Sequence, residues 1–142
     1  MTVPLINERL FIDTVFVQAL LNRRDQYHSV ALQLLPRVQA APEVWTTEAI
    51  LVEVGNALSD INRDTAVRFI RQCYKPGNLH VVTIDTRLMF AATDLYASRP
   101  DKGWGLTDCL SFVTMQEKGL SLAVTNDRHF VQAGFVALLL SL

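Results

Sequence analysis

Four carboxylates stand at positions where they could form one site: Asp13, Glu53, Asp108 and Asp127. Carboxylates in contact repel one another, by on the order of 4 kcal/mol for each pair at an effective dielectric of about 20. Such a cluster is stable if some of the acids are protonated or if cations neutralise it. Oxygen ligands without Cys or His favour Mg²⁺ or Mn²⁺ over zinc. Two such ions, roughly 4 Å apart, can activate a water molecule and stabilise the leaving oxygen when a phosphodiester bond is cleaved.

These acids need a scaffold that brings distant segments together, and the apolar pattern indicates alternating strands and helices. Short apolar segments predict strands at 10–12, 43–46, 79–84, 120–125 and 135–140. Apolar residues at helical spacing predict a helix that follows Asp13 and ends before Arg23, and further helices at 26–38, 47–60, 65–74, 86–97, 107–118 and 127–132. Apolar strands separated by helices favour an α/β fold, in which helices cover both faces of a parallel sheet.

Three of the acids fall where strands give way to helices. Asp13 ends the first strand, Asp127 follows the strand at 120–125, and Asp108 opens a helix after the polar loop 98–106. In open α/β sheets, ligands bind at the carboxyl ends of the strands. We therefore expect these three side chains to lie on one edge of the sheet.

Glu53 differs because it lies inside a predicted helix. Its helical neighbours Ile50, Val54 and Ala57 are apolar, so Glu53 projects from the side that should face the core. A carboxylate on a buried face is costly unless something pairs with it.

Each acid also has a purely structural interpretation. An Asp at a strand-to-helix junction often serves only to cap the helix. Glu53 could form a salt bridge, or the helix face could be misjudged. The convergence of all four acids, more than any one of them, favours a functional site.

The composition describes one globular domain, which we expect to span 1–142. Half of the residues are hydrophobic and 19% are charged, a balance that excludes a disordered chain. The formal net charge is −1, so no global positive field attracts nucleic acid. Attraction to RNA would have to come from bound cations or from local basic residues, of which the candidates are Arg23, Arg24, Lys102 and Arg128.

The sequence predicts a cytoplasmic protein without a membrane segment. Cys73 and Cys109 have no metal-ligand spacing and are expected to be buried, reduced thiols. The N-terminus lacks the basic-then-apolar layout of a signal peptide. No apolar stretch reaches the roughly 18 residues that a membrane span needs.

Four segments together resemble the PIN-domain ribonucleases, and among them the VapC-like toxins of bacterial toxin–antitoxin pairs. The segments are LFIDT around Asp13, TTEAILVEVGNAL around Glu53, LTDCLSF around Asp108 and TNDRHF around Asp127. No single segment is specific, but all four in order extend over almost the whole chain. The resemblance implies a three-layer α/β/α fold with a central parallel sheet of about five strands.

The resemblance also implies an activity and partners. The four acids would bind Mg²⁺ or Mn²⁺ and drive hydrolysis of single-stranded or structured RNA. Glu53 would hold a second metal or orient the attacking water, and Thr125 and Asn126 would be auxiliary polar residues of the site. A homodimer and a cognate antitoxin are the implied protein partners.

Other interpretations are weaker. A haloacid-dehalogenase-like phosphatase needs a second Asp two residues after the first, where this chain has Val15. A receiver domain needs a lysine that the strand ending at Thr125 does not supply. A catalytically inactive PIN-like module that binds RNA or protein remains the alternative function, although all four acids are present.

Two further residues have a functional and a structural interpretation. Trp104 could stack on a base, but a role in covering the loop or in a dimer contact is favoured. His129 lies two residues after Asp127 and could assist proton transfer, although a surface position is favoured.

Overall fold

A parallel sheet forms the centre of the protein, which is described by a computed structural model over residues 8–141. Its strands are β1 (Arg9–Ile12), β2 (Glu43–Thr47), β3 (Leu79–Val82), β4 (Leu122–Val124) and β5 (Val136–Ala137). Their order across the sheet is β3-β2-β1-β4-β5, and every neighbouring pair is parallel. The prediction that the N-terminus lacks the layout of a signal peptide concerns mainly residues 1–7, which lie outside the described residues.

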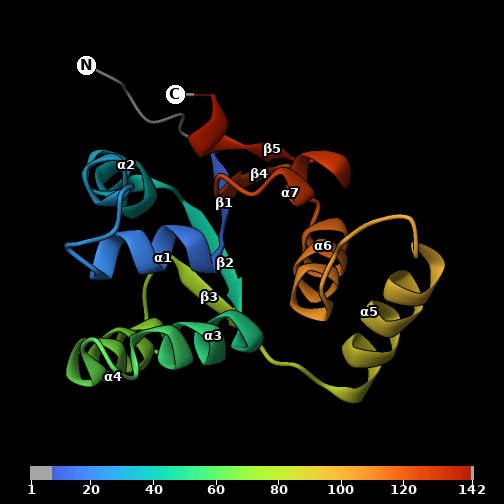
Figure 1. Ribbon diagram of the computed structural model, residues 1–142, viewed down its shortest axis with the longest axis horizontal. Helices are drawn as coiled ribbons and strands as arrows, with labels where there is room; N and C mark the ends of the chain where they lie inside the picture. The colour runs from blue at the N-terminus through green and yellow to red at the C-terminus, as the bar shows by residue number, and fades with distance from the viewer. Residues whose placement is uncertain (1–7, 142) are drawn as a thin grey trace.

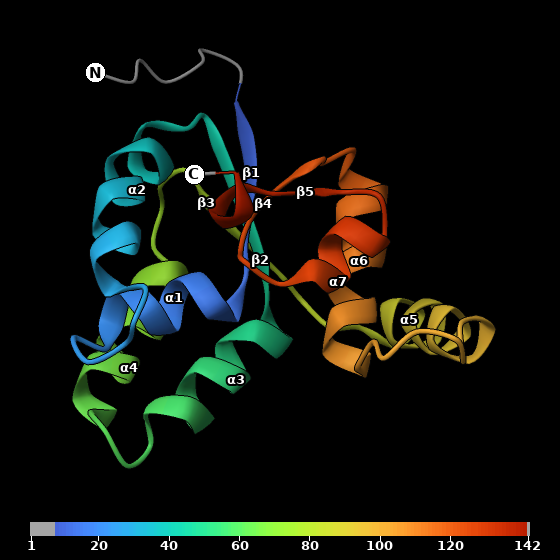
Figure 2. The ribbon, with the colours of Figure 1, turned by 45° about the horizontal axis from the view of Figure 1, so that its top comes forward.

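Helices cover both faces of this sheet, as Figures 1 and 2 show. One side carries α1 (Thr14–Leu21), α2 (His28–Ala40), α3 (Glu48–Leu58) and α4 (Arg63–Cys73). The other carries α5 (Thr86–Ser98), α6 (Leu106–Lys118) and α7 (Arg128–Gln132), with α5 packed against the outside of α6. The three-layer α/β/α arrangement with five parallel strands is therefore confirmed.

Apolar side chains from the central strand and its helices build the core. Phe11 of β1, which precedes Asp13 in the sequence, and Phe16 of α1, which follows it, are both buried. Phe112 of α6 meets Phe130 of α7 edge to face, with ring centroids 5.0 Å apart. The contact between Phe112 and Phe130 holds α6, which contains Asp108, against α7, which Asp127 precedes.

The register of the sheet places two key segments side by side. Ile12 of β1 is paired with Val124 of β4, so Asp13 and Thr125 are the next residues on neighbouring parallel strands. On the other side of β1, Phe11 is paired with Trp45 of β2, and α3 begins directly after β2 at Thr47. The Thr47 hydroxyl accepts from Ile50 N at 3.3 Å and so caps the start of α3. Helices α1 and α3 therefore both begin at the same edge of the sheet, where β1 and β2 end.

Several predicted boundaries need correction. The expected strand at 135–140 is wrong in its second half: pairing stops at Ala137, and a 3₁₀ turn (Leu138–Leu140) follows. In that turn, Leu139 N donates to Thr125 O, so the chain bends back toward the end of β4 and does not extend the sheet. The strands expected at 79–84 and 120–125 are also shorter than predicted. Conversely, α2 continues past the exposed Pro36 to Ala40.

Three other features of the structure agree with the sequence predictions. Gly119 ends α6 as expected, with a left-handed backbone (φ 68°) that only glycine adopts without strain. Both cysteines are buried and unpaired. Among the described residues, no helix combines the length and the apolar character that crossing a membrane requires.

Candidate active site

Asp13 is the most buried of the four predicted acids, with 7% of its surface exposed. It occupies the N-cap position of α1, yet its side chain makes no capping hydrogen bond. Its Oδ2 instead accepts a hydrogen bond from Thr125 Oγ1 at 2.8 Å. The capping interpretation therefore does not account for this residue.

The surroundings of Asp13 disfavour its charged form. Burial is the largest cause, and the nearby charges of Asp108 and Asp127 act in the same direction. Hydrogen bonds from Thr125 and from the backbone of Thr14 oppose them. The net effect raises the pKa of Asp13 from 3.8 to about 6. A nearby cation would reverse this preference by stabilising the carboxylate.

Asp108 is the third residue of α6 and has two hydrogen-bond donors. Gly105 N donates to its Oδ2 at 3.1 Å, and His129 Nδ1 lies 2.9 Å from the same oxygen. Its pKa is raised chiefly by burial and also by the charge of Asp127, while the bonds from Gly105 and His129 lower it. Asp108 therefore supports the start of its helix and also faces a second acid.

Asp127 follows β4 and caps α7 through a bond from His129 N to its Oδ1 at 2.9 Å. The same carboxyl lies beside Asp108: ligand atoms of Asp108, Asp127 and His129 all lie within 4.8 Å of one another. A metal ion could be held by atoms at such separations. Capping and a role in the site are thus compatible for this residue.

Thr125 joins two of the acids. It is completely buried, its hydroxyl donates to Asp13, and the same oxygen accepts from Asp127 N at 3.1 Å. One side chain therefore fixes the carboxylate after β1 relative to the backbone after β4. Asn126, the other predicted auxiliary residue, is half-buried, and its side chain has no hydrogen bond to the described residues.

Glu53 reaches the site through α1. Thr14 Oγ1 donates to Glu53 Oε2 at 2.9 Å, and Thr14 is the residue that follows Asp13. Ile50 and Val54 are buried as expected, and Glu53 itself is half-buried. Within residues 8–141, Glu53 forms no salt bridge, so that structural interpretation fails. Both Glu53 and Asp13 are outside the group of mutually close ligand atoms, which among the described residues comprises Asp108, Asp127 and His129.

His129 is the residue that sequence reasoning undervalued. We expected a surface histidine, but its ring is half-buried, with Nδ1 2.9 Å from Asp108 Oδ2 and 3.5 Å from Asp127 Oδ1. The contact with Asp127 has a local cause, because this N-cap side chain accepts from the backbone of His129 and so lies beside that residue. The spacing of Asp127 and His129 was the available signal.

Trp104 has the structural role that was favoured for it. Only 7% of its surface is exposed, its Nε1 donates to Gln132 Oε1 at 3.0 Å, and its ring meets Phe112 edge-on. A buried indole has no free face for a base. By anchoring the loop before α6, Trp104 helps to position Gly105, whose N–H binds Asp108.

Comparisons with known proteins agree with this geometry. The PIN domain family model matches residues 10–136. The solved structure of VapC20 from Mycobacterium tuberculosis, a toxin that cleaves the sarcin–ricin loop, is 26% identical with a TM-score of 0.81; the match covers 89% of this chain and 96% of that one. No curated protein matches the chain in sequence.

Two more distant structures share the fold. A toxin–antitoxin complex from Klebsiella pneumoniae is 18% identical (TM-score 0.60, covering 85% of this chain and 88% of that one). VapBC2 from Rickettsia felis, bound to a DNA fragment of its promoter, is 15% identical (TM-score 0.62, covering 92% and 96%). The family model extends over nearly the whole chain and includes all four acids. The chain therefore belongs to the PIN domain family, and it is similar to the VapC toxins, as its four segments predicted.

Proposed function

We propose that this protein is a metal-dependent endoribonuclease and the toxin of a toxin–antitoxin pair. Its catalytic residues, which are also its metal ligands, are Asp13, Glu53, Asp108 and Asp127. The observation that carries the proposal is the convergence of acids from β1, β4 and α6 at one edge of the sheet, with Glu53 tied to them through Thr14. Residues 1–142 act as one domain in this proposal.

The donor atoms suit a hard divalent cation. Burial, and to a smaller extent the neighbouring acids, raise the pKa values of Asp13 and Asp108, so a bound cation would stabilise their charged forms. Carboxylate oxygens favour Mg²⁺ or Mn²⁺. Asp108 and Asp127 would hold the ion, with Asp13 and Glu53 completing the site. When bound, the ion neutralises the acids and makes a water molecule more acidic.

The protein's own residues orient these groups. Thr125 holds Asp13, Gly105 N–H holds Asp108, and Thr14 holds Glu53. Fixed carboxylates lose little freedom when substrate binds, which favours catalysis. Glu53, which accepts from Thr14 through Oε2, would orient the attacking water with its other oxygen.

RNA is the proposed substrate and an antitoxin the proposed partner. VapC20 is a toxin that cleaves the sarcin–ricin loop, which supports RNA, and the Klebsiella and Rickettsia structures support an antitoxin. We further propose a homodimer that acts in the cytoplasm. The alternative, an inactive PIN-like binding module, is disfavoured because such modules need not keep four acids and the hydrogen bonds that orient them.

Expression in bacteria tests this proposal. Wild-type protein should arrest growth and fragment cellular RNA, whereas Asp13→Asn and Asp108→Asn should do neither. Both variants keep the shape of the side chain, and circular dichroism should show an intact fold. If folded variants arrested growth as well as wild type does, the assigned site would be wrong. If wild type left RNA intact, the binding-module alternative would replace the nuclease.

A further inference from the structure

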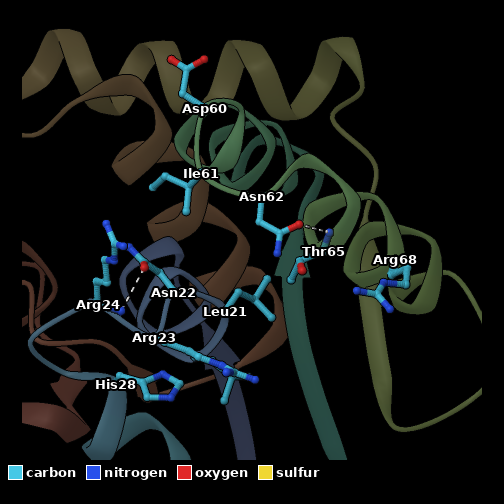
Figure 3. Close-up of a pocket in the computed structure, with 11 residues that line it drawn as sticks. Leu21, Asn22, Arg23, Arg24, His28, Asp60, Ile61, Asn62, Thr65 and Arg68 are labelled. Atoms are coloured by element: carbon cyan, nitrogen blue, oxygen red, sulfur yellow. Dashed lines mark hydrogen bonds between the residues drawn. The ribbon is translucent and has the colours of Figure 1, made fainter.

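One cleft of the described protein has none of the four acids in its lining. It opens between the end of α1 and the turn from α3 to α4, has a volume of about 820 Å³, and is shown in Figure 3. The residues that the argument uses come from three places. They are Arg23, Arg24 and His28 of the α1–α2 region, Asp60 and Asn62 of the α3–α4 turn, and Arg68 of α4.

This cleft is positively charged, although the whole chain has a net charge of −1. Its lining contains three arginines, Arg23, Arg24 and Arg68, and a single acid, Asp60. Arg23 and Arg24 are exposed and form no ion pair with any described residue. Arg68 pairs with Asp64 at 3.2 Å, but both side chains are largely exposed, so this pair contributes little. The cleft is therefore able to attract and bind an anion.

The walls of the cleft are held by local hydrogen bonds. Asn22 Oδ1 accepts from Arg24 N at 3.1 Å, and Asn62 Oδ1 caps α4 by accepting from Thr65 N at 3.1 Å (Figure 3). His28 Nδ1 donates to Ala19 O at 2.8 Å, which leaves Nε2 available to a ligand. The backbone around Arg23 and Arg24 is thus fixed before a ligand arrives, and little ordering of the chain opposes binding.

The cleft is connected to the acids by two helices. Asp13 precedes α1, and Arg23 and Arg24 follow it, so the length of α1 separates them, about 12 Å at 1.5 Å per residue. On α3, Glu53 is likewise followed by Asp60 at the cleft, and α1 and α3 pack against each other (Figure 2). A polymer whose reacting group lies at the acids can therefore extend over α1 and α3 into the cleft.

We propose that this basic cleft binds backbone phosphates of the RNA a few nucleotides from the cleaved bond. The proposal rests on the proposed function. Guanidinium groups bind phosphate oxygens through paired hydrogen bonds, and phosphate contacts position a nucleic acid without reading its sequence. RNA is favoured over an acidic peptide because the cleft lies one helix length from the acids, a distance that a few nucleotides can span. It also supplies the local positive charge that a net acidic nuclease needs.

Binding without cleavage tests the cleft separately from catalysis. A fluorescently labelled single-stranded RNA is titrated in excess EDTA with wild type, Arg23→Gln/Arg24→Gln and Arg68→Gln. Arg71→Gln is the matched control, because Arg71 is also an exposed arginine of α4 but does not line the cleft. We expect the double variant to weaken binding at least tenfold, Arg68→Gln to weaken it less, and Arg71→Gln to leave it unchanged.

Salt dependence supplies a second measurement. For a single strand, the slope of log K against log salt concentration should become shallower by about 0.7 for each phosphate that the variant no longer neutralises. A slope and affinity that are the same in wild type and the double variant would overturn the proposal. It would also be overturned if the double variant lost binding to polyglutamate but not to RNA, since the cleft would then fit an acidic protein.

Cleavage assays separate this proposal from the proposed function. In an active enzyme, the double variant should raise KM for a long RNA more than it lowers kcat. Unchanged KM with normal cleavage would refute the cleft and leave the nuclease intact. Conversely, a wild type that binds RNA through these arginines but cleaves nothing would support the cleft and refute the proposed function.

Discussion

The hydroxyl of Thr14 donates a hydrogen bond of 2.9 Å to Glu53 Oε2, which links the start of α1 to the middle of α3. Thr14 follows Asp13, whose own carboxyl is held by Thr125 at the end of β4. Two threonines thus connect the acid on α3 with the segments after β1 and β4. Asp108 and Asp127 complete the group beside His129.

The bond from Thr14 should be needed for activity more than for stability. Thr14→Val keeps the shape of the side chain but removes the donor, so Glu53 loses its orientation. We expect kcat to fall about tenfold or more, as for other displaced catalytic groups, with a small change in melting temperature. Thr14→Ser restores the donor and should restore most of the rate. Equal loss in both variants would show that packing, and not the hydrogen bond, is what matters.

Asp13 should destabilise the metal-free protein at neutral pH. Its pKa of about 6 in the folded state exceeds the ordinary 3.8, so the folded protein binds more protons than the unfolded chain between these values. The stability that the protonated form contributes is therefore complete below about pH 3.8 and is lost as the pH rises through 6.

Asp13→Asn removes this dependence and provides the test. In EDTA at about pH 7.5, the variant should be more stable than wild type, by up to about 3 kcal/mol if the whole pKa difference is expressed. Near pH 4 the two proteins should converge. Denaturant unfolding at both pH values measures the difference. Lower stability of the variant at neutral pH would mean that Asp13 is a structural residue.

His129 should affect metal affinity through its contact with Asp108. A neighbour that orients a ligand typically contributes 10–100-fold to metal binding. We expect His129→Ala to weaken Mn²⁺ binding, measured by calorimetry, within that range. His80→Ala is the control, because His80 is exposed on β3 and stacks on Trp45. Identical Mn²⁺ affinities for wild type and His129→Ala would exclude such a role.

A buried ion pair far from the acids should matter for stability alone. Glu8 accepts two bonds of 2.8 Å from Arg37, and only 1% of its side chain is exposed. Glu8→Ala leaves the guanidinium without its partner and should cost about 3 kcal/mol. Glu117→Ala breaks the exposed pair with Arg87 and should cost far less. Urea unfolding measures both losses of stability. Equal losses in the two variants would show that removing a negative charge, and not burial of the pair, is the cause.

Local patterns predicted the layers of the fold and the acids. Short apolar runs followed by residues at helical spacing indicated the order of strands and helices, and Thr47 and Gly119 mark helix ends through backbone chemistry. Glu53 was recognisable because an acid among Ile50 and Val54 contradicts the helix pattern.

Relationships between distant segments were harder to predict. The register of Ile12 with Val124 sets the Thr125–Asp13 bond, and no local signal fixes it. The apolar run after Phe135 suits a strand, but the sheet ends and Leu139 N turns back to Thr125 O. The contact of His129 with Asp108 depends on how α7 meets α6, and it therefore emerged only from the three-dimensional arrangement.

The central claim is that the four acids form one metal-dependent nuclease site, and cleavage rate against metal concentration tests it most directly. Purified wild type is titrated with Mg²⁺ and Mn²⁺ from excess EDTA, beside Asp108→Asn. We predict no cleavage in EDTA, activity that rises and saturates with either ion, and at least a hundredfold lower rate for the variant at saturation. Robust cleavage in excess EDTA, or equal rates for the two proteins, would contradict the claim.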